Sequence, residues 1–138
     1  MTIRKPATVA AVATALISSY VALSPAAHAA AHQSPSAAAS CYGSAHSYSK
    51  PAGSEWYPPL NSPNLKTTSA CSDINIKSDT NRYISVCFVP SSAPAYCQSS
   101  YTLVTAGQWK AIATDVASGT VFYFDFRSTA LSNGYWAA

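Results

Sequence analysis

Hydrolytic chemistry is the first use to consider for the many serines of this chain. A serine hydrolase needs a nucleophile, a general base and an orienting acid within hydrogen-bond reach of one another. The sequence has no G-x-S-x-G, and beyond its N-terminal forty residues the only histidine is His46. A single histidine on a predicted strand is more often an ordinary surface or cleft residue than a catalytic base. We therefore expect no catalytic residues, and a hydrolase with an unrecognised site is an alternative hypothesis.

Carboxylates offer two further kinds of chemistry. Asp115 and Asp125 lie on neighbouring predicted strands, where a pair of carboxylates could hydrolyse a glycosidic bond. Residues 73–81 contain D-x-N twice, which superficially suggests a calcium loop. A calcium loop needs several convergent oxygens and a sharp bend, whereas Ile74 and Ile76 alternate as in a strand. We expect surface or turn roles for these acids, with no metal site and no cofactor.

Aromatic side chains form the most suggestive set. Flat rings with hydroxyl and amide neighbours are suited to stacking on sugars or to holding a peptide. The period-2 pattern of residues 42–49 places three rings on one predicted face, and two more follow in a Pro-rich loop. The candidate binding residues are Tyr42, His46, Tyr48, Trp56 and Tyr57. The alternative is that Trp56 and Trp136 cover the open ends of the domain.

Four cysteines, Cys41, Cys71, Cys87 and Cys97, are the remaining reactive groups. Four cysteines allow three pairings, which the sequence alone does not distinguish. We favour Cys41–Cys71 and Cys87–Cys97, because neighbouring cysteines close the shorter loops. No C-x-x-C is present, so zinc binding is disfavoured.

The segment between the last two cysteines has a separate potential use. If Cys87 and Cys97 pair, residues 88–96 become a tethered loop stiffened by Pro90 and Pro94. Such a loop loses little entropy on docking, which is what a protease-inhibitory loop requires. A small secreted protease inhibitor is therefore a second alternative, against the simpler interpretation as a hairpin connection.

The elements that must position these residues are strands. Alternating apolar residues predict strands near 42–49, 73–77, 82–89, 96–104, 108–116 and 120–127, whereas residues 50–68 are Pro-rich and predict a long loop. No segment after residue 40 shows helical periodicity over a dozen residues. The sequence predicts an all-β domain, a small antiparallel β-sandwich or barrel-like fold, with a core around Ile84, Val86, Phe88, Phe122, Phe124 and Phe126.

The N-terminus has the pattern of an export signal. Arg4 and Lys5 precede an uncharged apolar stretch, and Ala27-His28-Ala29 matches the small-x-small pattern of a signal-peptidase site. We expect a signal peptide at 1–29, cleaved near Ala29-Ala30, a flexible leader at 30–40 and a disulfide-stapled β-domain at 41–138. The expected location is extracellular, where disulfides persist.

The net charge of the predicted exported part limits the classes of partner that we expect. The predicted exported part carries six basic and five acidic side chains, so no basic field attracts nucleic acid or a membrane surface. Few charges and many serines and threonines leave an extracellular carbohydrate or protein as the expected partner. Oligomeric state is not indicated.

Three stretches resemble small secreted actinobacterial proteins of unknown function. They are Cys71 to Lys77, the strand 82–88 with Cys87, and the segment from Ala106-Gly107-Gln108-Trp109 through Gly119-Thr120-Val121-Phe122. The shared motifs are paired cysteines, turn glycines and core aromatics, and the resemblance covers most of residues 41–138. It implies a compact exported β-domain and carries over no catalytic residues.

Overall fold

The computed structural model describes residues 40–138, and the predicted signal peptide and residues 30–39 of the predicted leader lie outside the described residues. A short helical turn at 40–43 precedes ten strands. The strands are β1 (His46–Lys50), β2 (Trp56–Tyr57), β3 (Leu65–Lys66), β4 (Ile74–Ser78), β5 (Arg82–Phe88), β6 (Tyr96–Cys97), β7 (Thr102–Val104), β8 (Trp109–Ala113), β9 (Val121–Phe126) and β10 (Ser132–Ala137).

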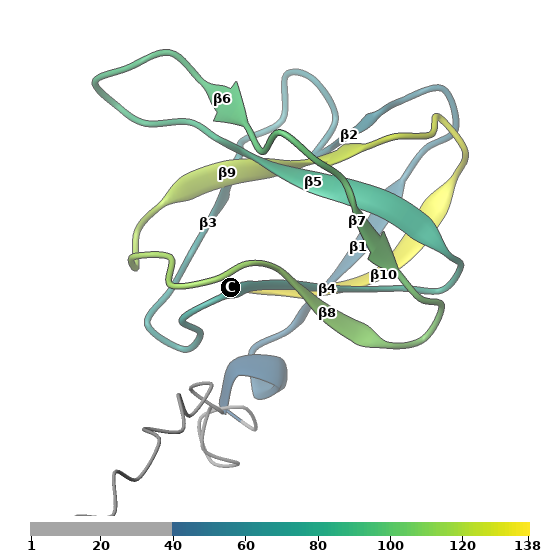
Figure 1. Ribbon diagram of the computed structural model, residues 1–138, viewed down its shortest axis with the longest axis horizontal. Coiled ribbons are helices and arrows are strands. Elements are labelled where there is room, and N and C mark those ends of the chain that lie inside the picture. The colour runs from purple at the N-terminus through teal and green to yellow at the C-terminus, as the bar shows by residue number, and fades with distance from the viewer. Residues whose placement is uncertain (1–39) are drawn as a thin grey trace, which may run out of the picture. The chain divides into compact units, whose positions relative to one another are not determined.

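Two antiparallel sheets form the domain. The four-stranded sheet has the order β1-β10-β4-β8. The six-stranded sheet has the order β2-β9-β5-β6, with β3 also paired to β9 and β7 also paired to β5. Figure 1 shows the two sheets as facing layers, with β5 and β9 in one and β4 and β8 in the other. The predicted antiparallel sandwich is therefore confirmed.

The core lies between the sheets and follows the alternation of β9. Phe122, Phe124 and Phe126 point inward and are fully buried, whereas the residues between them are half-buried. Ile84 and Val86 of β5 meet them from the neighbouring strand. The predicted core is thus confirmed except for Phe88, which is only partly buried. The remaining buried members of this cluster are Tyr48, Ile74, Ile76, Val104, Ile112, Ala113, Trp136 and Ala138.

Both favoured disulfides are present. Cys87 and Cys97 are direct partners in the β5–β6 ladder, so their bond closes a hairpin. Cys41 and Cys71 join the helical turn to the segment before β4 and form a second buried cluster with Ala137. Two disulfides are consistent with a protein that resides outside the cytoplasm.

The first predicted strand is shorter than its pattern suggested. The sequence pattern predicted a strand from Tyr42, whereas β1 begins at His46. The amide and hydroxyl of Ser44 both donate to the Cys41 carbonyl, at 3.1 and 2.7 Å, and close a turn beside the disulfide. Local hydrogen bonds of this kind compete with strand pairing.

Two other segments also differ from the prediction, and the strand β10 was not predicted. The 50–68 loop contains the two-residue strands β2 and β3, and the expected strand at 96–104 is divided into β6 and β7. Each short strand is defined by its pairing with β9 or β5, the long central strands of the sheet.

A buried lysine positions the turn before β2. The ammonium of Lys50 donates to the carbonyls of Ser54 and Ala130 at 2.6 and 2.7 Å. Burial, and then the positive charge of Arg82, lower the pKa of Lys50 below its ordinary value. The hydroxyl of Ser54 in turn donates to the Trp56 carbonyl at 2.9 Å. The Lys50 cation therefore fixes the loop that presents Trp56.

Candidate binding face

The outer face of the six-stranded sheet carries a row of side chains at its centre. Because β9 buries its phenylalanines, Tyr123 and Asp125 point to the opposite side of the sheet. Asp125 is the direct partner of Trp56 on β2 and of Ser85 on β5. Directly paired residues project from the same face. Trp56, Asp125 and Ser85 therefore form one row across the sheet.

Aromatic and apolar side chains surround this row. Tyr83 and Leu103 are direct partners on β5 and β7, and both are exposed. Trp56 is 37% exposed, Tyr101 41% and Tyr83 46%. We call this surface the aromatic face and define it by Trp56, Tyr83, Tyr101, Leu103 and Tyr123, with Asp125 at its centre.

The Asp125 carboxylate is held by two hydroxyl donors. Tyr101 donates to Oδ2 at 2.8 Å, and Ser85 donates to the same oxygen at 3.4 Å. The hydrogen bond to Asp125, and secondarily burial, raise the pKa of Tyr101 above its ordinary value. Since the Tyr101 proton points at the carboxylate, the centre of the aromatic face presents mainly hydrogen-bond acceptors.

Trp56 separates two hollows in the surface. One, of about 190 Å³, is lined by Trp56, Pro58, Pro59, Leu60, Asn61, Ser62, Asn64 and Tyr123. A second, more open hollow lies against Gly53, Ser54, Glu55, Trp56, Pro59, Leu60 and Thr129. The indole is thus accessible from two sides, and amide and hydroxyl groups lie beside it.

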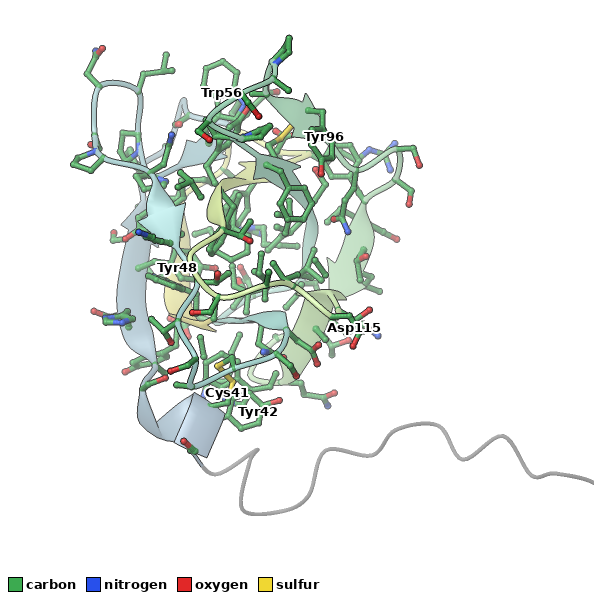
Figure 2. All side chains as sticks on the ribbon, turned by 90° about the vertical axis from the view of Figure 1, so that its left-hand side faces the viewer. Cys41, Tyr42, Tyr48, Trp56, Tyr96 and Asp115 are labelled. Carbon is green, nitrogen blue, oxygen red and sulfur yellow. A yellow bond between two sulfur atoms is a disulfide. The ribbon has the colours of Figure 1, made fainter. Side chains whose placement is uncertain are left out.

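The predicted binding residues do not form one surface. Tyr42 stacks on Trp109 with ring centroids 4.6 Å apart, and His46 stacks on Trp136 at 4.7 Å. Both partners are residues of the four-stranded sheet. Figure 2 shows Tyr42 and Trp56 at opposite ends of the domain.

Two of the predicted residues point inward. Tyr48 is 4% exposed and its hydroxyl is 3.0 Å from that of Ser132. Burial raises the pKa of Tyr48. Tyr57 is partly buried and packs against Tyr48 at 5.3 Å between ring centroids. Of the five, only Trp56 belongs to the aromatic face.

The carboxylate pair considered for glycosidic hydrolysis does not form, and the two acids lie in different sheets. Asp125 lies on β9 in the six-stranded sheet, whereas Asp115 follows β8, in the four-stranded sheet. Asp115 has a positive φ of 55°, and its amide donates to the Asp73 carboxylate at 3.1 Å. Asp73 and Asp115 thus stabilise a loop together. Within residues 40–138, no group of three or more His, Cys, Asp or Glu side chains is placed to hold a metal ion.

The 88–96 segment is an exposed, covalently closed hairpin. Residues 91–95 are all exposed, and the Cys87–Cys97 bond lies at the base of the loop. The rings of Phe88 and Tyr96, the next pair of the ladder, pack with centroids 5.4 Å apart. In Figure 1 the loop between β5 and β6 projects beyond the sheet.

Sequence reasoning missed four residues of the aromatic face and considered Asp125 only for glycosidic hydrolysis. The missed residues are Tyr83, Tyr101, Leu103 and Tyr123. A usable signal was present in residues 121–126, where Tyr123 and Asp125 alternate with the core phenylalanines and so must face outward.

No protein-family model, curated protein or solved structure matches the chain. Across the described residues, no helix has the length and apolar character needed to cross a membrane.

Proposed function

We propose that this chain is a secreted, non-enzymatic β-domain that binds an extracellular ligand on its aromatic face. The proposal rests on one observation: exposed rings from three separate segments, and a half-buried ring from a fourth, surround a carboxylate that is fixed by two hydrogen bonds. Aromatic groups around a few well-placed polar atoms are typical of binding sites. Export is part of the proposal, and the two disulfides support it.

The test measures binding of two probe sets, a labelled polysaccharide array and a displayed random-peptide library. We expect at least one probe to bind, and Trp56→Ala and Tyr83→Ala to weaken it about tenfold or more each, as for residues at the centre of an interface. Tyr135→Ala is the matched control, because Tyr135 is as exposed as Tyr83 but lies on the other sheet.

Two results would overturn the proposal. One is binding that depends on Tyr135 and not on Trp56. The other is a homogeneous preparation of the protein that turns over a substrate, which would restore the hydrolase alternative.

A second candidate function, protease inhibition, is favoured by the closed hairpin. A loop tethered by a disulfide and stiffened by Pro90 and Pro94 docks with little loss of entropy. We expect stoichiometric inhibition of a serine protease, with slow cleavage mapped by mass spectrometry to residues 88–96. Inhibition that survives replacement of residues 91–93 by glycines would exclude this loop as the contact.

A further inference from the structure

We infer that the ligand of the aromatic face is an uncharged glycan chain. This inference rests on the proposed function and specifies its ligand. A sugar ring has an apolar C–H surface and an edge of hydroxyl groups. It therefore needs flat rings to stack on and hydrogen-bonding groups between them. Trp56 and the Asp125 carboxylate, with the Tyr101 ring beside them, offer this combination, whereas Ser85 is buried beneath the face.

Hydrogen-bond polarity at the centre of the face selects a ligand rich in donors. The hydroxyls of Tyr101 and Ser85 both donate to Asp125 Oδ2, so their protons are already used. What remains for a ligand is the acceptor capacity of the carboxylate and of the Tyr101 oxygen. Sugar hydroxyls donate to such acceptors, and hydrogen bonds to a carboxylate are among the stronger ones. A Pro-rich peptide presents mainly carbonyl oxygens, which are hydrogen-bond acceptors. These oxygens cannot form hydrogen bonds to the acceptors at the centre of the face.

The charges of the face favour a neutral ligand over an ionic one. Asp125 and Glu55 are balanced in part by Arg127, and all three act on the Tyr101 hydroxyl. The Arg127 guanidinium lies over the Tyr83 ring, 5.7 Å from its centroid. Two carboxylates against one guanidinium discourage a polyanion, and the guanidinium beside them weakens the attraction for a polycation.

Arg82, the other cation near the aromatic face, already has hydrogen-bond partners within the domain. Arg82 lines a hollow together with Arg127, but its guanidinium donates to the carbonyls of Asn81 and Leu131 at 2.8 and 2.7 Å. Arg82 therefore presents no open fork to a uronate or a sulfate group, and the Arg127 guanidinium is held against the Tyr83 ring.

The smaller hollow beside Trp56 sets the size of the group that it takes. Its volume of about 190 Å³ is below the roughly 300–1,000 Å³ of sites for drug-sized ligands. It suits one sugar ring placed against the indole. Asn61, Ser62 and Asn64 at its wall can hydrogen-bond to the hydroxyls of that ring.

The experiment compares three soluble probe classes by titration calorimetry against the oxidised protein. The neutral probes are cellohexaose, laminarihexaose, maltohexaose, xylohexaose and chitohexaose, the anionic probes are heparin and polygalacturonate, and the peptide probe is a Pro-rich peptide. We expect a neutral hexasaccharide to bind, with an affinity that changes less than about twofold between about 0.05 and about 0.5 M salt, because no ion pair forms.

Three variants test the contacts. Asp125→Asn and Trp56→Ala should each weaken hexasaccharide binding by about tenfold or more. Tyr101→Phe removes the donor that orients the carboxylate and should weaken binding by a few-fold. Tyr135→Ala should leave it unchanged, and circular dichroism of each variant verifies the fold.

The outcomes separate this inference from the proposed function. Binding of the peptide or of an anionic polymer, lost in Trp56→Ala, would overturn the glycan inference and leave the aromatic face as the binding surface. Hexasaccharide binding that is insensitive to Trp56→Ala and Asp125→Asn would overturn both. Absence of Trp56-dependent binding to every probe class would also overturn both.

Discussion

The outer faces of the two sheets carry similar residues in different surroundings. Tyr83 on the six-stranded sheet and Tyr135 on the four-stranded sheet are both 46% exposed. Each has a cation over its ring, Arg127 at 5.7 Å and Lys77 at 5.3 Å. Judged by exposure alone, the two tyrosines are equivalent.

The difference lies in what surrounds each tyrosine. On the four-stranded sheet Lys77 also lies over Trp109 at 5.7 Å, and Tyr42 stacks on the same indole. Two of these rings therefore stack on each other, and one cation lies over both Trp109 and Tyr135. On the six-stranded sheet the rings surround the Asp125 carboxylate, and hollows flank Trp56. A polar group held in place among the rings, rather than exposure of the rings, therefore distinguishes a candidate binding face from a surface whose side chains contact mainly one another.

A large loss of stability is expected from a change in the backbone packing of the four-stranded sheet. Gly134 lies in β10 between β1 and β4, opposite Tyr48 and Ser78. A Cβ at this position would collide with the Lys77 carbonyl, and its φ of +155° is unusual for other residues. We expect Gly134→Ala to lower the free energy of unfolding by about 3 kcal/mol or more.

Urea denaturation measures this loss. Gly43→Ala is the control, because nothing lies within 4 Å of a Cβ added there. Its effect should stay within about 0.5 kcal/mol. Equal stability of the two variants would show that β10 can shift away from β4 without cost.

The two disulfides should differ in how much each contributes to the free energy of unfolding. Their sequence separations are 30 for Cys41–Cys71 and 10 for Cys87–Cys97. In the loop-entropy model, replacing both cysteines of a pair by alanine costs about 3.7 kcal/mol for the first pair and about 2.8 kcal/mol for the second. Thermal unfolding of the two double variants measures this order.

The same variants have different consequences for binding. The Cys97 sulfur lies 3.9 Å from the Tyr123 hydroxyl, at the rim of the aromatic face. Loss of Cys87–Cys97 should therefore also weaken binding, whereas loss of Cys41–Cys71 should leave it intact in the folded protein. The reverse pattern would move the binding surface to the four-stranded sheet.

A smaller effect concerns the lysine that supports Trp56. In Lys50→Met the part-buried carbonyls of Ser54 and Ala130 lose the ammonium. We expect a loss of stability of about 1 kcal/mol, the lower end of the range for unsatisfied polar groups. The exposed Lys110→Met on β8 should change stability by no more than about 0.5 kcal/mol. Chemical denaturation measures the stability of the two variants. Equal denaturation midpoints would show that water replaces the Lys50 ammonium as the hydrogen-bond donor.

Sequence patterns predicted the parts of the fold that local periodicity controls. Alternation identified the inward phenylalanines of β9 and the buried face of β5, because the two sides of a strand differ in burial. The short strands β2 and β6 were missed or merged, because two residues carry no pattern and are defined only by pairing with β9 and β5.

The candidate site was harder to predict, because it depends on strand order. Tyr101 reaches Asp125 only because β7 and β9 flank β5 on opposite sides in one sheet. Nothing in the local sequence encodes that neighbourhood. Tyr48 was placed with Tyr42 by a period-2 pattern, but the turn that Ser44 closes interrupts the strand, and Tyr48 points into the core.

The smallest expected effect tests the contact at the centre of the aromatic face. Asp125 raises the pKa of Tyr101, chiefly through their hydrogen bond. A raised pKa in the folded state means that the contact contributes stability below the unfolded tyrosine pKa of about 10 and loses it as the pH rises through the folded value. Asp125→Asn should lower the pKa of Tyr101, and the alkaline loss of stability should become shallower.

Phenolate absorbance, with Tyr101→Phe to assign the titration, measures that pKa in the wild type and in Asp125→Asn. Because Tyr101 is well exposed, solvent screens the contact and the effect on stability is small. If the Tyr101 pKa is unchanged in Asp125→Asn, the hydroxyl does not orient the carboxylate. The contrast between the two outer faces would then rest on the hollows beside Trp56 alone, and a hollow also lies beside Tyr135.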